Sequence, residues 1–253
     1  MDRYFENKIA VVTGAGSGIG RASAITFAEN GAKVIVADIE PVSGTETVNL
    51  IKKNNGEAIF VKTDVSKSED VEKLVLKTIE IYNRIDIAFN NAGIEVPMAK
   101  IADILEEDWD RIININLKSV WLCMKYEIGA MLLQGCGVIV NMSSVVGILG
   151  QQDMASYVAC KHAIIGLTKT AALEYASKGI RINAVCPVIV DTPMLERYTK
   201  GDPDTIAGLS AQYPLKRLIK PQEVANAVLW LCSEKSSYIN GHSLVMDGGF
   251  SIQ

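Results

Sequence analysis

The sequence has little of what marks metal sites or disulfide frameworks. Its two histidines, His162 and His242, are too far apart for an H-E-x-x-H zinc site. Its five cysteines are an odd number, lie far apart and form no C-x-x-C, so neither a disulfide framework nor a zinc knuckle is expected. We therefore predict no metal site.

The chain also lacks a long apolar run and a basic tract. No apolar stretch approaches the ~18 residues of a membrane-spanning helix, and the charged start, MDRYFENK, has no apolar core of a signal peptide. The formal net charge is −4 and the lysines are scattered, which argues against a nucleic-acid partner. We expect a cytoplasmic protein that acts on a small molecule and binds neither membrane nor nucleic acid.

What the sequence does have is a recurring series of short apolar runs rich in β-branched residues. They cover residues 8–13, 33–38, 58–63, 85–90, 137–143, 180–186 and 242–246. Segments between them, such as 18–30, 67–82, 109–133, 155–177 and 221–233, carry helical spacing. This alternation predicts an α/β fold with a parallel sheet covered on both faces. Because no linker interrupts the pattern, we expect a single domain over residues 1–253.

Residues 193–220 differ from this pattern. They mix Gly, Pro and Asp with isolated apolar residues and show no clean period. A long irregular insertion in a compact α/β domain is more often a functional lid than a plain surface loop. We expect this segment to be a substrate-binding lid.

The stretch TGAGSGIG, residues 13–20, follows the first apolar run and holds Gly14, Gly16, Gly18 and Gly20. These glycines do not fit G-x-G-x-x-G in any register and spell G-x-x-x-G-x-G instead. A strand, this loop and a helix beginning near Ile19 would present backbone N–H groups to an anion, where glycine leaves room for a pyrophosphate. The alternative is a glycine-rich turn used only for tight packing.

Asp38 favours the first of these alternatives. It closes the second predicted strand, 18 residues beyond Gly20, where a dinucleotide fold places a carboxylate on the ribose hydroxyls of adenosine. A 2′-phosphate would face that charge, and neither the glycine loop nor Ile39 offers a basic residue to offset it. The expected cofactor is therefore NAD in preference to NADP.

Two further segments follow predicted strands. Asp64 and Val65 come after the third, and the NNAG segment, with Asn91, Ala92 and Gly93, comes after the fourth. NNAG alone is a plausible turn, so its weight comes from its position. Because cofactors bind at the carboxyl ends of strands in such sheets, we expect both segments to contact the cofactor.

In YVACK, Tyr157 and Lys161 are spaced to lie one above the other on a helix face. An ammonium near a phenol favours the phenolate and lowers the tyrosine pKa from about 10 towards working pH, so the pair can serve as a general acid/base. Tyr4 and Lys8 share this spacing before the first strand, and we interpret that pair as structural. Ser144, thirteen residues before Tyr157, can reach the same edge and donate to a substrate oxygen.

TGxxxGxG, Asp38, NNAG, NINL, Ser144 with Tyr157 and Lys161, and DGG near the end together resemble the short-chain dehydrogenase/reductase family, over essentially the whole chain. The resemblance implies one doubly wound domain with a seven-stranded parallel sheet, often assembled as a homotetramer. It makes the helix of residues 154–177 and the last segment, HSLVMDGGFSIQ, candidate interface pieces.

The resemblance also assigns roles to residues that match its motifs. Asn116 in NINL corresponds to an asparagine that holds a proton-relay water beside the lysine, in preference to Asn114. Lys161 would hydrogen-bond the nicotinamide ribose. Val190 and Thr192 in PVIVDT match positions that bind the carboxamide.

The resulting expectation covers two sets of residues. The catalytic set is Asn116, Ser144, Tyr157 and Lys161. The cofactor-binding set is Gly14, Ser17, Gly18, Ile19, Gly20, Asp38, Asp64, Val65, Asn91, Ala92, Gly93, Tyr157, Lys161, Pro187, Val190 and Thr192, with Ile19 flanking the nicotinamide ring.

The chain departs from the family at one position and carries one ambiguous cysteine. Val188 follows Pro187 where the family usually has Gly. Because a β-branched residue disfavours positive φ, the loop there could run differently or narrow the substrate pocket. Cys160 could be a redox-sensitive thiol, but we interpret it, like His162, as structural.

The expected reaction is the interconversion of a secondary alcohol and a ketone by hydride transfer, with Tyr157 as the general acid/base. The sequence SVVGILG and the apolar lid residues suggest a cyclic or aliphatic alcohol; sugar, steroid and 3-hydroxyacyl substrates stay open. The alternative enzyme is a 3-oxoacyl reductase. The alternative outside catalysis is a dinucleotide-sensing scaffold protein.

Overall fold

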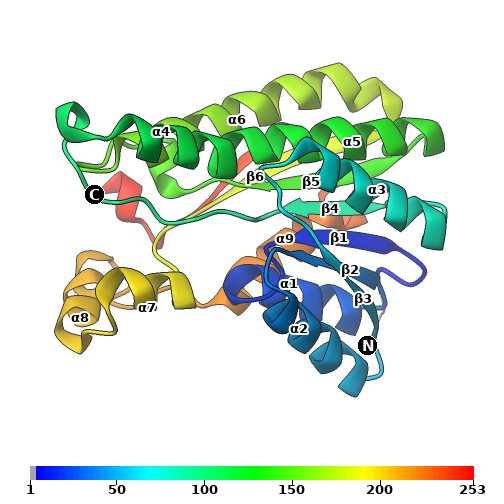
Figure 1. The fold of residues 1–253 in the computed structure, drawn as a ribbon, viewed down its shortest axis with the longest axis horizontal. Coiled ribbons are helices and arrows are strands. Elements are labelled where there is room, and N and C mark those ends of the chain that lie inside the picture. Colours follow the sequence, from blue (N-terminus) through cyan, green and yellow to red (C-terminus); the bar gives the residue numbers. More distant parts are fainter. Residues whose placement is uncertain (1–3) are drawn as a thin grey trace.

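Seven parallel strands form one sheet within residues 4–253, the part of the chain that the computed structural model describes (Figure 1). They are β1 (Ile9–Thr13), β2 (Lys33–Asp38), β3 (Glu57–Lys62), β4 (Ile87–Asn90), β5 (Gly137–Met142), β6 (Ile180–Pro187) and β7 (Ser243–Met246). Their order across the sheet is β3-β2-β1-β4-β5-β6-β7. This confirms the predicted doubly wound α/β fold, and every predicted strand end lies within two residues of the observed one.

One face of the sheet is covered by α3 (Ser68–Tyr82), α5 (Ser119–Gln134) and α6 (Ala155–Tyr175), the upper layer in Figure 1. In α3 the buried residues recur at helical spacing, from Val71 through Leu74 to Thr78, so one side of the helix is apolar. Leu74 packs in one cluster with Met124 of α5 and Ile164 of α6. The first core of the protein lies between this layer and the sheet.

The other face is covered by α1 (Gly18–Glu29), α2 (Pro41–Lys53) and α9 (Pro221–Cys232), the lower layer in Figure 1. Phe27, Ile51 and Val228, one from each helix, join the strand residues Val12 and Val36 in a second core. The strands are thus buried on both sides, which explains why they read as near-continuous apolar runs. The helical segments named from the sequence did not include α2.

The predicted helix over residues 109–133 is divided in the structure. It consists of α4 (Glu106–Ile112), a π-helical stretch η2 (Ile113–Lys118) and α5. Hydrophobic spacing could not reveal this, because a π-turn changes the hydrogen-bond pattern while leaving the chain helical. The segment with helical spacing thus covers three consecutive helical elements.

Residues 193–220 are also more regular than expected. They form α7 (Pro193–Thr199) and α8 (Pro203–Gln212), which Figure 1 shows beside the sheet and outside both helical layers. Each helix has proline in its first turn, and the Asp202 side chain accepts a hydrogen bond from the Thr205 N–H at 3.0 Å. Residues that suggested an irregular segment are thus helix-start residues.

The chain reverses direction across the sheet between β1 and β4. From β1 it proceeds to β2 and β3 on one side, then returns to β4 and continues to β7 on the other. Such a switch point leaves a crevice at the carboxyl ends of the two strands. The glycine loop follows β1 and the NNAG segment follows β4, so both meet there.

Candidate active site

The glycine loop is packed so tightly that two of its positions exclude a side chain. A Cβ on Gly20 would collide with the Gly14 carbonyl oxygen, and Gly14 itself has a φ of +64°. A Cβ on Gly14 would also lie 2.9 Å from the Ala92 Cα. Glycine is therefore required here for backbone conformation and for close approach to the NNAG segment.

The loop ends at the N-terminus of α1. Its N-cap residue, Ser17, makes no side-chain capping bond, and within the described chain no acidic residue occupies the first turn of this helix. The first N–H groups of a helix need acceptors and lie at its positive end. The residues here fit a phosphate-bearing cofactor, because a pyrophosphate would supply those acceptors.

Asp38 lies against this loop. Its Oδ2 accepts a hydrogen bond from the Gly16 N–H at 2.7 Å, and its Oδ1 accepts one from the Glu40 N–H at 3.0 Å. Arg21, one turn into α1, donates to the Gly16 carbonyl at 2.9 Å and pairs with Glu46 at 2.7 Å. The carboxylate thus stands at the end of β2 beside the loop, as expected, and the nearby arginine is engaged by an acid of α2.

The NNAG segment is tied to the end of β1. The Asn91 side chain donates to the carbonyls of Thr13 and Gly14 at 3.0 and 3.2 Å. In return the Thr13 hydroxyl accepts the N–H groups of Asn91 and Ala92 at 3.0 and 3.2 Å. The structure therefore brings Asn91 and Ala92 next to the glycine loop, and Thr13 is the residue that joins them.

Asp64 and Val65 lie at the neighbouring strand end. Val65 is buried in a cluster against which Ala92 packs. Asp64 accepts hydrogen bonds from the N–H and hydroxyl of Ser66 at 3.1 and 2.6 Å. The carboxylate is thus used in its own turn, while Val65 supplies the apolar contact to the NNAG segment.

Gly93 and Asn116 are adjacent. A Cβ on Gly93 would approach the Asn116 Oδ1 to 3.1 Å. Asn116, buried in η2, accepts the Ile94 N–H at 2.8 Å and donates to the Ile94 carbonyl at 2.9 Å. Asn114, the other candidate, is exposed. The structure thus directs Asn116 to the segment after β4.

Tyr157 and Lys161 lie on the same side of α6, with the Lys161 Nζ 5.2 Å from the centre of the Tyr157 ring. Lys161 is buried, and its ammonium donates to the Met142 carbonyl at 2.9 Å at the end of β5. Burial raises the pKa of Tyr157 to about 12 and lowers the pKa of Lys161 to about 8. The expected lowering of the Tyr157 pKa is therefore wrong for the protein by itself, because burial disfavours the charged phenolate.

Ser144 lies just beyond β5 at the same edge. Its hydroxyl donates to the Pro187 carbonyl at 3.3 Å and accepts the Val146 N–H at 3.4 Å. Both bonds are long for a hydroxyl. The adjacent Ser143 is more firmly held and donates to the Lys161 carbonyl at 2.9 Å. Ser144 is therefore the hydroxyl that a new partner can recruit.

The segment after β6 approaches the glycine loop. A Cβ on Gly18 would lie 3.2 Å from the Thr192 Cγ2, and Val190 forms an isolated bridge with Ile219. Val188 is not among the residues with positive φ; it is buried with Val145 and Tyr213. The departure from Pro-Gly thus places an apolar side chain in the cluster beside Ser144.

The structure also decides between the two interpretations of Cys160. Its thiol is fully buried and lies 3.7 Å from the Ile112 carbonyl. Burial raises its pKa to about 11, which disfavours the reactive thiolate. The packing role predicted for this cysteine fits these observations.

Four residues of this region were not identified from the sequence. Thr13 and Arg21 brace the glycine loop, as described above. Glu95 and Arg197 form an ion pair at 2.8 Å between the segment after β4 and α7. Thr13 could have been found from its place at the end of β1, but a contact between residues 95 and 197 has no signal in one sequence.

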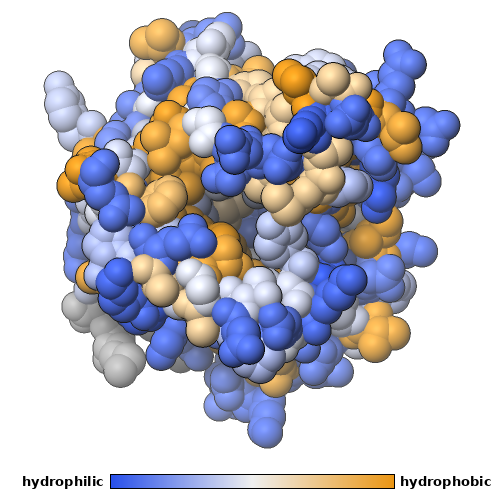
Figure 2. All heavy atoms as spheres, turned by 90° about the vertical axis from the view of Figure 1, so that its left-hand side faces the viewer, coloured by the Kyte–Doolittle hydropathy of each residue, from blue (hydrophilic) through white to orange (hydrophobic). Residues whose placement is uncertain are grey.

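Figure 2 shows the face on which α7 and α8 lie, where apolar side chains gather around a hollow with hydrophilic residues at its rim. None of the helices in residues 4–253 combines the length and apolar character that crossing a membrane requires. Nor does this part of the chain bring three His, Cys, Asp or Glu side chains together in a way that could hold a metal ion.

Comparison with known proteins gives matches over almost the whole chain. A family model described as Enoyl-(Acyl carrier protein) reductase matches residues 14–251. The cyclohexanol dehydrogenase of Acinetobacter sp. (strain SE19) is 38% identical over 251 residues, 99% of this chain and 98% of the relative. The 3-oxoacyl (acyl-carrier-protein) reductase of Thermotoga maritima is 40% identical over 247 residues, 98% of this chain and 99% of the relative.

Solved structures with the same fold also match over almost the whole chain. That of levodione reductase matches with a TM-score of 0.95 at 35% sequence identity and covers 98% of both chains.

Proposed function

The chain belongs to the short-chain dehydrogenase/reductase family and is an oxidoreductase, and we propose that it interconverts a secondary alcohol and a ketone with NAD. The observation that carries this proposal is the meeting of Tyr157 and Lys161, 5.2 Å from ring centre to ammonium, at the strand edge that also holds the glycine loop. A proton donor, a cation and an anion-binding helix end are what carbonyl reduction by a dinucleotide requires.

Tyr157 is the general acid/base in this proposal. With its pKa raised to about 12, the phenol is protonated at neutral pH and can donate to a ketone oxygen as the alcohol forms. In the reverse direction it accepts the hydroxyl proton, and the Lys161 ammonium stabilises the resulting phenolate. Because the pKa of Lys161 is lowered to about 8, this support weakens as the pH rises above that value.

Ser144 and Asn116 assist from the two sides. The weakly held Ser144 hydroxyl turns from the Pro187 carbonyl to the substrate oxygen and fixes the position of the reacting carbon. Asn116 holds the backbone of Ile94 and so fixes the wall of the site next to Gly93. We assign Asn116 to the catalytic set as the residue that would hold a proton-relay water beside Lys161.

The glycine loop and α1 N-terminus would hold the pyrophosphate of NAD, and Asp38 would accept the ribose hydroxyls of adenosine. The remaining contacts are assigned to Val65, Ala92 and the 187–192 segment. The nicotinamide of the bound cofactor supplies the site that accepts or gives up a hydride. NAD is preferred because the Asp38 carboxylate repels a 2′-phosphate and Arg21 is already paired with Glu46.

The cofactor preference is tested by kcat/KM with NAD and with NADP. We expect NAD to be preferred, and D38A to narrow the difference by removing the repulsion. An equal or better value with NADP in the unchanged protein would overturn the preference.

The apolar cluster beside Ser144 favours an apolar substrate. Val145, Val188 and Tyr213 are buried together beside Ser144, with Phe250 of the last 3-10 turn stacked edge-on against Tyr213 at 5.3 Å. The similarity to a cyclohexanol dehydrogenase and to levodione reductase supports a cyclic alcohol or ketone. The similarity to a 3-oxoacyl (acyl-carrier-protein) reductase supports the alternative, a carrier-bound substrate.

NADH fluorescence during incubation with NAD and a panel of cyclic, aliphatic and 3-hydroxyacyl alcohols tests the reaction and its substrate. A signal with cyclic alcohols supports the leading proposal, and a signal only with 3-hydroxyacyl compounds supports the alternative. No signal with any member would leave the dinucleotide-sensing scaffold as the better interpretation.

We further propose that residues 193–220 act as the substrate lid of this single domain and that the protein is a homotetramer. For assembly, a groove of about 290 Å³ between α5 and α6 is lined by Trp121, Leu167 and Tyr175, and Leu173 of α6 is 85% exposed. Exposed apolar side chains on two packed helices are typical of an interface. Light scattering tests the assembly, and a monomeric mass would refute it.

A further inference from the structure

An ion pair closes the gap between the lid and the segment after β4. The Arg197 guanidinium of α7 bonds both oxygens of the Glu95 carboxylate, from Nε at 2.8 Å and from Nη2 at 3.1 Å. Such a two-point contact fixes the relative orientation of both groups. Within residues 4–253, no other ion pair joins α7 or α8 to a different element.

Glu95 is flanked by residues of the proposed site. Ile94 before it is held at both backbone groups by Asn116. Val96 after it is buried in a cluster against which Tyr157 packs. Glu95 therefore projects from a backbone whose position is set by the catalytic region.

Arg197 is fixed from the lid side. Two residues before it, Leu195 is 6% exposed and anchors α7. The neighbouring Tyr198 donates its hydroxyl to the Met98 sulfur at 3.0 Å, a second contact between α7 and the same segment. The ion pair therefore joins α7 to the segment after β4, and further contacts hold each of these two segments in place.

Glu95 supplies the negative charge that pairs with Arg197 between the segment after β4 and α7. Hydrogen bonding from Arg197 lowers the pKa of Glu95, with Arg111 of α4 as a further positive neighbour, so the carboxylate is ionised at neutral pH. Without the Glu95 carboxylate, Arg197 would lose its ion-pair partner among the described residues. A free guanidinium there would bind the carboxylate of a substrate in the same two-point manner.

We propose that Glu95 sets the charge selectivity of the site by occupying Arg197, so that uncharged alcohols and ketones are accepted in preference to those that carry a carboxylate. Glu95 thus acts on specificity through Arg197 and takes no part in proton transfer. The inference rests on the proposed function for the kind of substrate that enters the site.

The test compares cyclohexanol with 4-hydroxycyclohexanecarboxylate, which adds a carboxylate to the same ring. In E95Q we expect the ratio of kcat/KM to move towards the carboxylate by roughly tenfold, the effect of one charge-assisted hydrogen bond, mainly through KM. Sodium chloride should reduce this gain, because the pair is partly exposed. In R197Q the gain should be absent.

A binding measurement separates this inference from the proposed reaction. Isothermal titration calorimetry gives the Kd of cyclohexanecarboxylate for the protein saturated with its reduced dinucleotide, without turnover. A roughly tenfold lower Kd in E95Q supports the inference even if no alcohol is oxidised, in which case only the proposed reaction fails. An unchanged Kd overturns the inference even if alcohols are oxidised.

Arg217 and Glu223 offer a matched control. They form the same kind of two-point pair, with both distances 2.7 Å and similar exposure, but they join the segment before α9 to the start of that helix. E223Q frees an arginine and changes the net charge as E95Q does. Equal tightening of cyclohexanecarboxylate in E223Q would overturn the inference, because the effect would then come from overall charge.

Discussion

Two tyrosine–lysine pairs with the same sequence spacing have different surroundings. Tyr157 and Lys161 lie together on α6 at the carboxyl edge of the sheet. Tyr4 instead receives a hydrogen bond at 3.0 Å from Lys235, whose ammonium also lies 4.3 Å from the centre of the Tyr4 ring. The spacing is the same in both pairs, so what distinguishes them is the set of groups around each lysine.

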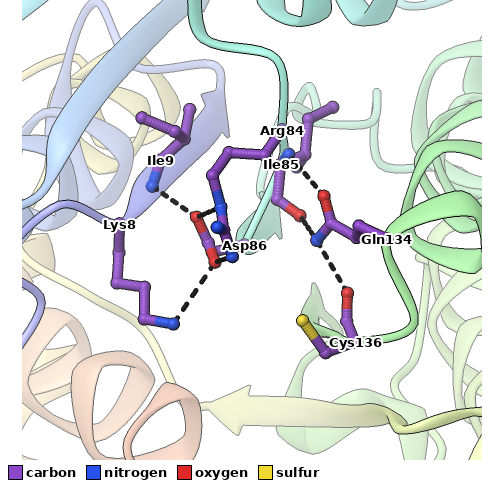
Figure 3. A network of polar contacts seen from close by, with 7 residues as sticks. All are labelled: Lys8, Ile9, Arg84, Ile85, Asp86, Gln134 and Cys136. Atoms are coloured by element: carbon purple, nitrogen blue, oxygen red, sulfur yellow. Dashed lines mark hydrogen bonds and ion pairs between the residues drawn. The ribbon is translucent and has the colours of Figure 1, made fainter.

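Lys8, the partner of Tyr4 in the sequence, belongs to a network at the amino edge of the sheet (Figure 3). It approaches Asp86 at 3.4 Å, and Asp86 also accepts the Ile9 N–H and the Arg84 Nε–H, each at 2.9 Å. Gln134 closes the other side of the network by accepting the Ile85 N–H at 3.1 Å. Each of these groups already has a partner, so the network ties β1, β4 and β5 together and leaves little capacity for a ligand.

The carboxyl edge of the same strands is less completely paired. Lys161 is buried with a single carbonyl partner, and Ser144 makes two long bonds. Burial lowers the pKa of Lys161, so keeping its ammonium charged in the fold costs stability at neutral pH. One end of the sheet is thus built for stability, and the other keeps polar groups available for a reaction.

The buried carboxylates of the two regions differ in the same way. Asp86 faces cationic groups, whereas Glu127 of α5 is 1% exposed and bonds the Asn90 amide at 3.0 Å. Asn90 in turn donates to Asn141 at the end of β5. Burial raises the pKa of Glu127 to about 7. A carboxyl group without a cation is therefore tolerated beneath the carboxyl edge.

The largest effect should separate the two tyrosines. We expect Y157F to lower kcat by about 10³-fold, because it removes the proposed general acid/base, and to leave the Kd for NADH nearly unchanged. Y4F should leave kcat at the wild-type value. Steady-state rates with the best alcohol of the panel check both variants. A Y157F enzyme with wild-type kcat would mean that the two pairs do not differ in the proposed way.

The next largest effect is on stability at the amino edge. D86N should lower the free energy of unfolding by roughly 3 kcal/mol, because it weakens the hydrogen bonds that Ile9 N–H and Arg84 donate to a buried carboxylate. The activity of the folded protein should be retained. Urea denaturation measures the first quantity and kcat per folded molecule the second. A variant that loses activity but no stability would reverse the roles given to the two edges.

Glu127 should give the protein a distinct dependence on pH. Folded Glu127 keeps its proton up to about pH 7, whereas the unfolded chain releases it above the ordinary pKa of 4.5. Between these values the folded state binds more protons, so the free energy of unfolding should fall as the pH rises, by roughly 3 kcal/mol from this group. Above pH 7 the contribution should be constant.

E127Q should flatten this part of the stability profile, because the amide cannot ionise. Urea denaturation of both proteins at several pH values between 4.5 and 7 measures the difference. E80Q, on the exposed side of α3, is the matched control and should keep the wild-type slope. The same slope in wild type and E127Q would show that Glu127 is ionised in the fold.

The smallest effect is expected at Lys8. Its side chain is 45% exposed and its ammonium lies 3.4 Å from Asp86, so K8M should lower the free energy of unfolding by less than about 1 kcal/mol. The corresponding change at the other pair, K161M, should instead act on kcat. A large loss of stability in K8M would indicate that Lys8, and not Arg84, balances Asp86.

The sequence predicts the strands well because their apolar runs are buried on both faces and carry the signal in adjacent residues. It predicts α7 and α8 poorly. Pro193 and Pro203 suggest breaks in a pattern, yet proline is favoured in the first turn of a helix, where its missing N–H costs nothing. Proline can therefore mark either a break or the start of a helix, and only the residues after it distinguish the two cases.

In the candidate site, too, some features could be predicted from the sequence and others could not. Asp38, Tyr157 and Lys161 could be predicted because strand ends and helix faces convert sequence spacing into position. The pKa of Tyr157 could not, since it depends on how many apolar groups surround the hydroxyl in three dimensions. The contact of Glu95 with Arg197 joins residues 102 positions apart and is fixed only by how α7 folds against the segment after β4.

The π-helical stretch η2 constrains how many residues the segment between α4 and α5 can contain. A π-turn holds more residues than an α-turn, and each residue of an α-helix advances the helix by about 100°. Deleting one residue among 113–118 would let an α-turn close with α4 and α5 still in register, but it would remove the π-turn that directs the Asn116 amide to Ile94. This part of the chain should therefore accept many substitutions on its exposed positions and no change in residue number.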